Sequence, residues 1–118
     1  MTQYIQFPHE LDKPSRWGSQ EIPKHTQESL ENYLINGYHP GGFVTAVLTN
    51  DLYGAVARAD YVNKANIMAI TDWVINYAPS RAWGSQSAVN MWIDNVDQVR
   101  TRYAEQVKKE YTWKTLKG

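Results

Sequence analysis

Apolar side chains recur every three or four residues along most of the chain, which is the spacing of one face of an α-helix. The first periodic stretch predicts a helix over about residues 27–36. Thr26 is a suitable N-cap, Glu28 would place an anion in the first turn, and Gly37 would end the helix. The apolar face of this helix consists of Leu30, Tyr33 and Leu34.

The second periodic stretch predicts a helix over about residues 43–59. Its middle is weakened by Asn50, Asp51 and Gly54, because these residues favour caps and turns over helix interiors. The same residues leave an alternative open, in which two short helices follow one another and Asn50 caps the second. The apolar stripe consists of Val44, Leu48, Leu52, Ala55 and Ala59, widened by Phe43, Ala46 and Val47.

Two further helices follow, each introduced by a capping residue. Asp60 is expected to cap the first of them, and Pro79 prevents its continuation. After a loop over residues 78–84, Ser85 is expected to cap a last long helix that ends near residue 110. The stripe of the first helix consists of Ile67, Ile70, Val74 and its last residue, Tyr77. The stripe of the last helix consists of Val89, Trp92, Ile93, Val96, Val99, Tyr103 and Val107.

Residues 1–25 differ from the rest because their prolines are spaced too closely for a long helix. We expect an extended arm there, with a short strand at Tyr4–Phe7. The chain of 118 residues fits one all-α domain, in which four or five helices over residues 26–111 form a small bundle. The basic tail, residues 112–118, is expected to fray.

Composition limits the classes of function. The chain has 12 Lys+Arg and 12 Asp+Glu, so its net charge is zero and it lacks the basic excess that general nucleic-acid binding requires. It has no cysteine, which excludes disulfide scaffolds, thiolate metal sites and cysteine nucleophiles. No apolar run approaches the ~18 residues of a membrane span, and the N-terminus lacks the pattern of a signal peptide. We therefore expect a cytoplasmic protein without membrane association.

Three segments are candidates for ligand binding. The first is His39-Pro40-Gly41-Gly42-Phe43, in which two glycines at the start of a helix let backbone N–H groups approach an anion closely. The alternative is a tight turn between helices, in which glycine supplies only conformational freedom. The segment is no phosphate loop, because the lysine and hydroxyl residues that end that motif are missing.

The second segment contains Asn50, Asp51 and Arg58. Asp51 and Arg58 are seven residues apart, so they share one face of a helix and can contact the same ligand. The alternative is a helix cap together with a partly buried ion pair between Asp51 and Arg58. Such a pair adds little net stability, and its use would be specificity.

The third segment contains Arg81, Trp83 and Ser85, in a loop that opens a helix. An arginine and a tryptophan placed together can hold an anion and stack on a planar ring. The alternative is structural, with Trp83 covering one end of the bundle and Ser85 serving only as the cap.

The sequence contains no pattern that is typical of a catalytic or metal-binding site. The three histidines have no metal-ligand spacing, and no cluster of carboxylates completes a metal site. No Gly-x-Ser-x-Gly elbow is present for a serine nucleophile. We therefore expect a protein that is not an enzyme and that uses no cofactor or metal.

The chain has five tryptophans and eight tyrosines, which is more than a core of this size needs. Three fall on or near the apolar stripes and are expected in the core, namely Trp73, Trp92 and Tyr103. Six others are expected at least partly exposed, namely Tyr4, Trp17, Tyr53, Tyr61, Tyr111 and Trp113. Exposed aromatic side chains indicate an interface with another molecule. Together with the long last helix and the zero net charge, they predict a homo-oligomer.

Part of the sequence resembles a family of small proteins encoded by tailed bacteriophages and prophages, over about residues 22–93. The motifs that carry the resemblance are Ile22-Pro23, Leu30-Glu31-Asn32-Tyr33, Gly37, Pro40-Gly41-Gly42-Phe43, Ala46-Val47-Leu48, Asn50-Asp51-Leu52, Arg58-Ala59-Asp60, Trp73, Asn76, Pro79 and Trp83-Gly84-Ser85. These motifs specify no activity. What the resemblance implies is a setting, the cytoplasm of an infected bacterium, and an accessory role in host takeover or anti-defence rather than a capsid role.

Two function hypotheses follow. The first is a non-enzymatic binding protein that sequesters a small anionic, nucleotide-like signalling molecule, with the three candidate segments converging on one site. The second is a protein–protein module that inhibits or modulates a host factor through its aromatic surface, or a structural homo-oligomer with no small ligand. Convergence of the glycine and tryptophan segments favours the first hypothesis, and an exposed aromatic patch favours the second.

Overall fold

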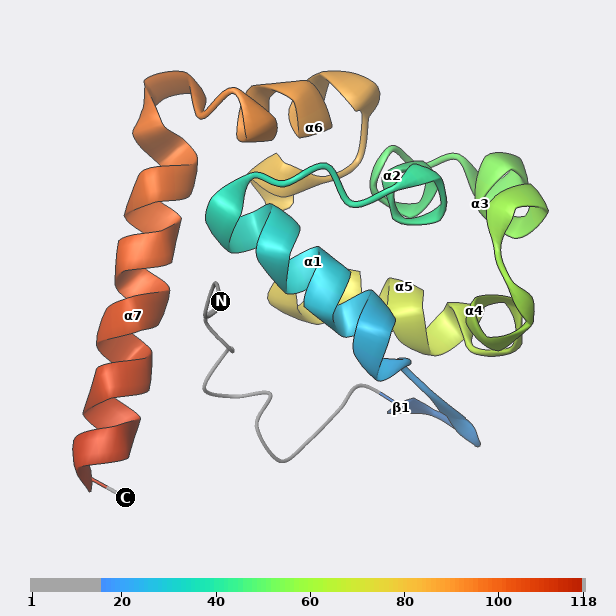
Figure 1. The fold of residues 1–118 in the computed structure, drawn as a ribbon, viewed down its shortest axis with the longest axis horizontal. Coiled ribbons are helices and arrows are strands. Elements are labelled where there is room, and N and C mark those ends of the chain that lie inside the picture. The colour runs from blue at the N-terminus through green and yellow to red at the C-terminus, as the bar shows by residue number, and fades with distance from the viewer. Residues whose placement is uncertain (1–15, 118) are drawn as a thin grey trace.

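The structure is a computed structural model that describes residues 16–117 (Figure 1). The all-α fold class predicted from the sequence is confirmed. This part of the chain has seven α-helices and one hairpin, whose two strands have two residues each. The elements are β1 (Arg16–Trp17), β2 (Gln20–Glu21), α1 (Lys24–Asn36), α2 (Gly42–Leu48), α3 (Leu52–Arg58), α4 (Tyr61–Ala65), α5 (Ile67–Tyr77), α6 (Gln86–Ile93) and α7 (Val99–Lys117), with short 3-10 helices η2 (Ser80–Ala82) and η3 (Val96–Gln98). The strand predicted at Tyr4–Phe7 lies outside the described residues.

One hydrophobic core joins most of these helices. It takes side chains from α1, α2, α5 and α6, while α7 contributes Val107. Helix α7 stands along one side of the molecule and packs on α1, while α3 and α4 lie at the opposite end (Figure 1). The largest fully buried side chains are those of Trp73, Tyr33, Leu30, Leu34, Leu48 and Ile70.

The hairpin fastens the end of the N-terminal segment to the start of α5. Its two strands are antiparallel, with Trp17 opposite Gln20. The Gln20 side-chain oxygen accepts hydrogen bonds from the backbone N–H groups of Met68 and Ala69, at 2.9 and 3.3 Å. These donors belong to the first turn of α5 and have no partner within the helix, so a residue far away in the sequence satisfies them.

Helix α1 begins earlier than its sequence predicts. Its N-cap is Pro23, and Lys24 is the first helical residue, so Thr26 and Glu28 are not the cap and the first-turn anion. Thr26 is instead buried inside the helix, where its hydroxyl donates a hydrogen bond to the Asn63 side-chain oxygen of α4. The predicted end is confirmed, because Gly37 terminates α1 with a φ of 71°.

The stretch predicted as one helix over residues 43–59 is two helices, which is the alternative that the sequence left open. The N-cap of α3 is Asp51 rather than Asn50. Asn50 adopts a left-handed backbone with a φ of 64°, which turns the chain between α2 and α3. The Asp51 carboxylate accepts a 2.9 Å hydrogen bond from the backbone N–H of Gly54.

The two remaining predicted helices are each divided as well. Asp60 caps α4 as predicted, but the helix stops at Asn66 and resumes as α5. Ser85 caps α6 as predicted, by accepting from the Ala88 N–H at 3.0 Å. The chain then leaves the helix at Asn95 and starts again as α7, which continues to Lys117 rather than ending near residue 110. The predicted number of four or five helices is therefore too low.

Candidate functional site

The first predicted segment meets Arg58 at the start of α2. Gly41 is the N-cap of α2 with a φ of 88°, and its N–H donates to the His39 ring nitrogen Nδ1 at 3.2 Å. A Cβ added at Gly42 would lie 3.2 Å from the Arg58 Cδ, so only glycine leaves ordinary contact distance for this arginine stem. The structure therefore brings together His39, Gly41, Gly42 and Arg58.

The second segment converges on the backbone of Gly54 rather than on a ligand. Asp51 accepts from the Gly54 N–H, and Arg58 Nη1 donates to the Gly54 carbonyl at 3.3 Å. A Cβ at Gly54 would clash with Asp51 Oδ2 and would lie 2.8 Å from Arg58 Nη1. Both charged side chains are exposed, and no ion pair within 4.0 Å joins them in the part of the chain that the structure describes. The prediction of a partly buried ion pair between Asp51 and Arg58 is therefore wrong, and Asp51 serves as a helix cap.

The third segment lies at the other end of α2. The Gly84 N–H donates to the carbonyl of Leu48, the last residue of α2, at 2.6 Å. Trp83 is half-buried against the core, and its indole N–H donates to the Ala78 carbonyl at 3.2 Å. Since Gly42 begins α2 and the Trp83 loop adjoins its end, the structure does not bring the two segments into one site. Trp83 follows the structural alternative, that of a side chain covering the bundle.

Two residues of the third segment border a cavity of about 460 Å³ beside α6. Arg81 stands in η2 and Ser85 is the cap of α6. The other lining residues are Ser87, Ala88, Met91, Trp92, Val96, Asp97 and Val99. These other residues were not predicted to bind a ligand, although Ala88 and Trp92 share one helix face with the predicted Ser85. Nothing in the sequence near Asp97 indicated that it lines a cavity, because it lies in a stretch predicted as continuous helix.

A second, smaller cavity of about 100 Å³ lies against the turn between α2 and α3. Of the predicted residues, Asn50 and Asp51 border it. The rest of its wall comes from Ala46, Val47, Leu52, Ala55, Ile67 and Thr71. This volume is well below the ~300–1,000 Å³ of small-molecule sites.

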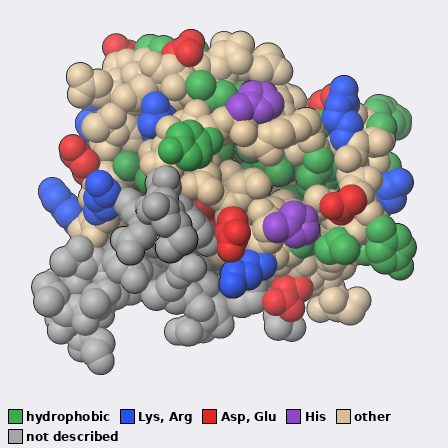
Figure 2. All heavy atoms as spheres, viewed as in Figure 1, with side chains coloured by type: hydrophobic (Ala, Val, Ile, Leu, Met, Phe, Trp, Pro, Cys, Tyr) green, Lys and Arg blue, Asp and Glu red, His purple; other side chains and the backbone are tan. Residues whose placement is uncertain are grey.

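Exposed apolar side chains concentrate on α3 and α4. Tyr53 and Tyr61 are 88% and 87% exposed, as the sequence predicts for these two tyrosines. Figure 2 shows hydrophobic groups at the right-hand edge of the molecule, over α3 and α4, with Lys and Arg groups among them. We call this surface the tyrosine face, and it consists of Leu52, Tyr53, Val56, Tyr61 and Val62.

Other expected positions of aromatic residues are confirmed where the structure describes them. Trp17 is exposed, and Trp73 and Trp92 are buried in the core. Tyr103 packs against the core, with its ring centroid 5.6 Å from that of Trp92. The side chains of Tyr4, Tyr111 and Trp113 lie outside the described residues.

Charges of both signs surround the tyrosine face. Arg58 and Lys64 supply positive charge, and Asp51 and Asp60 supply negative charge, all on exposed side chains. Asp60 Oδ2 lies 3.9 Å from the His25 Nε2 of α1. The face is therefore apolar at its tyrosines and electrically balanced at its margin.

Among the described residues, no group of three or more His, Asp or Glu side chains is placed to hold a metal ion. None of the described helices has both the length and the apolar character that crossing a membrane would require. No family model matches the sequence, and no curated protein or solved structure is similar enough to count as a relative.

Proposed function

We propose that this chain is a non-enzymatic protein-binding module that contacts its partner through the tyrosine face. The observation that carries the proposal is the near-complete exposure of Tyr53 and Tyr61 on adjacent short helices. Tyrosine is enriched among the residues that dominate binding energy at interfaces, because it offers a large amphipathic surface with only two side-chain torsions.

The two helices hold this face in a defined conformation. Asp51 caps α3 and Asp60 caps α4, the latter by accepting from the Asn63 N–H at 2.8 Å. Each helix uses a small part of its surface for burial, Ala55 in α3 and Asn63 in α4. The outward side is free for a partner, and its fixed backbone lowers the entropy lost on binding.

The nucleotide-sequestration hypothesis has weaker geometric support. It depended on Trp83 stacking on a base beside the glycine segment, but the Trp83 indole is engaged with Ala78 and the core. The phage resemblance supplies the setting of the proposal, in which the partner is a host protein in the cytoplasm of an infected bacterium.

The direct test is site-specific photocrosslinking in bacterial cells that express the protein. A photoreactive phenylalanine analogue replaces Tyr53 or Tyr61, and matched controls carry it at Tyr38 or Ile75, which are 54% and 58% exposed elsewhere. We expect one discrete adduct from positions 53 and 61 and none from the controls. Equal adducts from all four positions, or none from the tyrosine face, would overturn the proposal.

A second candidate, a homo-oligomer joined through the same face, is favoured by the balanced charges at its margin. Arg58 and Lys64 of one copy can meet Asp51 and Asp60 of another without net repulsion, as a two-fold interface requires. Light scattering at micromolar concentration should then give a mass that is a multiple of 13.6 kDa. A monomer would leave only the partner-protein proposal.

A further inference from the structure

The cavity beside α6 has the form of a groove along one helix face. Ser85, Ala88 and Trp92 line it, and they are separated by three and four residues. At a rise of ~1.5 Å per residue, this face extends for roughly 10 Å. We call the cavity the α6 groove. It shares no residue with the tyrosine face.

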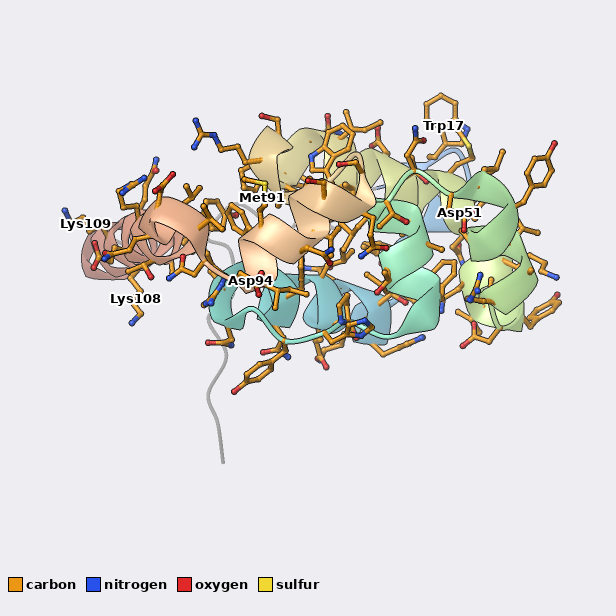
Figure 3. The ribbon with its side chains drawn as sticks, turned by 90° about the horizontal axis from the view of Figure 1, so that it is seen from above. Trp17, Asp51, Met91, Asp94, Lys108 and Lys109 are labelled. Atoms are coloured by element: carbon orange, nitrogen blue, oxygen red, sulfur yellow. The ribbon has the colours of Figure 1, made fainter. Side chains whose placement is uncertain are left out.

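The middle of the α6 groove is apolar and partly open to water. Met91 is 51% exposed and Val96 is 38% exposed, while Trp92, which also lines the groove, is buried. Figure 3 labels Met91 on α6 and Asp94 at the end of this helix. The volume of about 460 Å³ falls within the ~300–1,000 Å³ of small-molecule sites. An apolar ligand body would therefore remove Met91 and Val96 from water.

Opposite charges border the groove, one before α6 in the sequence and one after it. Arg81 precedes Ser85, and Asp97 follows the end of α6. Both are exposed, and within residues 16–117 neither makes a hydrogen bond or an ion pair. The Ser85 hydroxyl accepts from the Ala88 N–H, so its own O–H remains available to donate beside Arg81.

The segment that carries Asp97 is held in place. Asn95, Asp97 and Gln98 all have a left-handed backbone, with φ values of 57°, 53° and 58°. The Asn95 side chain fixes this segment to α7, by donating to the Thr101 hydroxyl at 2.7 Å and accepting from the Thr101 N–H at 3.2 Å. These two hydrogen bonds hold the positive-φ segment against the first turn of α7.

We propose that the α6 groove binds a linear dipolar ligand, with a carboxylate at Arg81, a cationic group at Asp97 and an apolar body that lies along the roughly 10 Å face of α6. The guanidinium and the Ser85 hydroxyl bind the carboxylate through charge-assisted hydrogen bonds. The Asp97 carboxylate binds the cation, and the apolar floor excludes species that are charged throughout. Two sources share this chemistry, a small amphiphile with charged ends and a short apolar peptide with free termini.

The primary experiment is a titration of the ¹⁵N-labelled protein followed by NMR. The probe is 8-aminooctanoate, and the controls are octanoate, which lacks the cation, and octylamine, which lacks the carboxylate. We expect shifts at the amides of Ser87, Ala88 and Val96, with about threefold to fivefold tighter binding of 8-aminooctanoate than of either control. No shifts at these amides, or equal affinity for the three compounds, would overturn the proposal.

A peptide arm distinguishes the two sources. Trileucine with free termini spans roughly 10 Å when extended, so its charges match the groove. Its acetylated and amidated form has the same apolar body without the charges. Tighter binding of free trileucine than of 8-aminooctanoate assigns the groove to peptides, and the reverse assigns it to small amphiphiles.

Matched variants test the two charges separately. Arg81→Gln and Asp97→Asn should each weaken 8-aminooctanoate binding about threefold to fivefold and abolish the preference over one control compound. Asparagine suits the left-handed backbone at position 97, so that variant retains the loop. The controls are Arg102→Gln and Asp94→Asn, which remove the same charges from exposed residues that do not line the groove. Equal weakening by these controls would show a nonspecific charge effect and overturn the site.

Discussion

Aromatic side chains are buried in one region of this molecule and exposed in another. In the first region, where α1 ends against α6, α7 and η2, the side chains of Tyr33 and Trp92 are buried and each polar tip has a hydrogen-bond partner. Tyr33 donates to the Ala82 carbonyl at 2.7 Å, and Trp92 donates to the Leu34 carbonyl at 3.2 Å. On the tyrosine face, by contrast, Tyr53 and Tyr61 are almost fully exposed.

Arg100 organises the first region, which we call the arginine junction. It donates to the carbonyls of Trp92 and Ile93 at the end of α6, at 3.1 and 3.3 Å, and to Ile35 at the end of α1, at 3.5 Å. These carbonyls lie at helix C-termini, where unpaired acceptors and the helix dipole favour a cation. One side chain of α7 therefore joins the ends of two other helices.

Stability and recognition are therefore separated in this fold. The arginine junction satisfies its polar groups within the chain, so a change there should destabilise the protein. The tyrosine face rests on the core through few side chains, so a change there should leave folding intact and alter binding.

The largest effect is expected from Trp92→Ala. It removes a buried indole from the core and leaves the Leu34 carbonyl without its donor. The free energy of unfolding should therefore fall by about 3–5 kcal/mol. Chemical denaturation measures the change. Trp17→Ala, at a tryptophan that is exposed, is the matched control and should shift stability by less than about 1 kcal/mol. Equal losses in the two variants would contradict the assignment of the core.

Arg100→Met should follow in size. Methionine retains most of the apolar stem but removes the donor from the helix-end carbonyls of Ile35 and Ile93, and leaves the Trp92 carbonyl with only the Asn95 N–H, at a cost of about 1.5–3 kcal/mol. Arg100→Lys should recover only part of this loss, because one ammonium cannot reproduce the planar fork of a guanidinium. Urea unfolding of both variants is the measurement, and an unchanged midpoint for Arg100→Met would exclude the junction as a source of stability.

Tyr33→Phe should have a smaller effect that depends on pH. Burial raises the pKa of the Tyr33 hydroxyl, while the nearby Arg100 charge lowers it to a lesser extent. The folded pKa lies above the unfolded value of about 10, so the stabilisation is complete below pH ~10 and is lost as the pH rises above that value. The variant should be about 1 kcal/mol less stable at neutral pH, and this deficit should shrink above pH ~10.

Unfolding free energies of wild type and Tyr33→Phe between pH 7 and 11 check this prediction. Their difference isolates Tyr33, because all other ionisable groups are the same in the two proteins. A deficit that stays constant with pH would show that Tyr33 ionises as easily in the folded as in the unfolded chain.

The smallest effect on stability is expected on the tyrosine face. The double variant Tyr53→Ser and Tyr61→Ser should change the free energy of unfolding by no more than about 0.5 kcal/mol per site. The same variant should lose partner binding, detected as loss of the photocrosslinked adduct from a probe at the exposed Val56. Destabilisation comparable to that of Arg100→Met would mean that the two regions are not separate.

Part of the candidate site could be predicted from the sequence, and part could not. Exposure of Tyr53 and Tyr61 was predictable, because both fall outside the apolar stripes of their helices. The engagement of Trp83 was not predictable, since its indole partner and its core neighbours depend on how the loop meets the end of α2. The convergence of Asp51 and Arg58 on Gly54 was likewise hidden, because spacing shows which side chains share a face but not which backbone atoms they reach.

The sequence by itself determined the all-α class, the caps at Asp60 and Ser85, and the end of α1 at Gly37. These features depend on interactions within a few residues, such as a side chain accepting from the N–H three positions later or a glycine adopting positive φ. Local interactions of this kind are present in the sequence pattern before any long-range contact forms.

Only the tertiary structure decided where the longer predicted helices break. The chain leaves the helix at Asn66, whose side-chain oxygen accepts from the Glu21 N–H at 3.0 Å, 45 residues away. It leaves the helix again at Asn95, beside the junction in which Arg100 joins the ends of α6 and α1. Apolar periodicity continues through both breaks, so the pattern alone favours unbroken helices. Contacts between distant segments decide otherwise, because they supply hydrogen-bond partners for helix ends that a single helix could not satisfy.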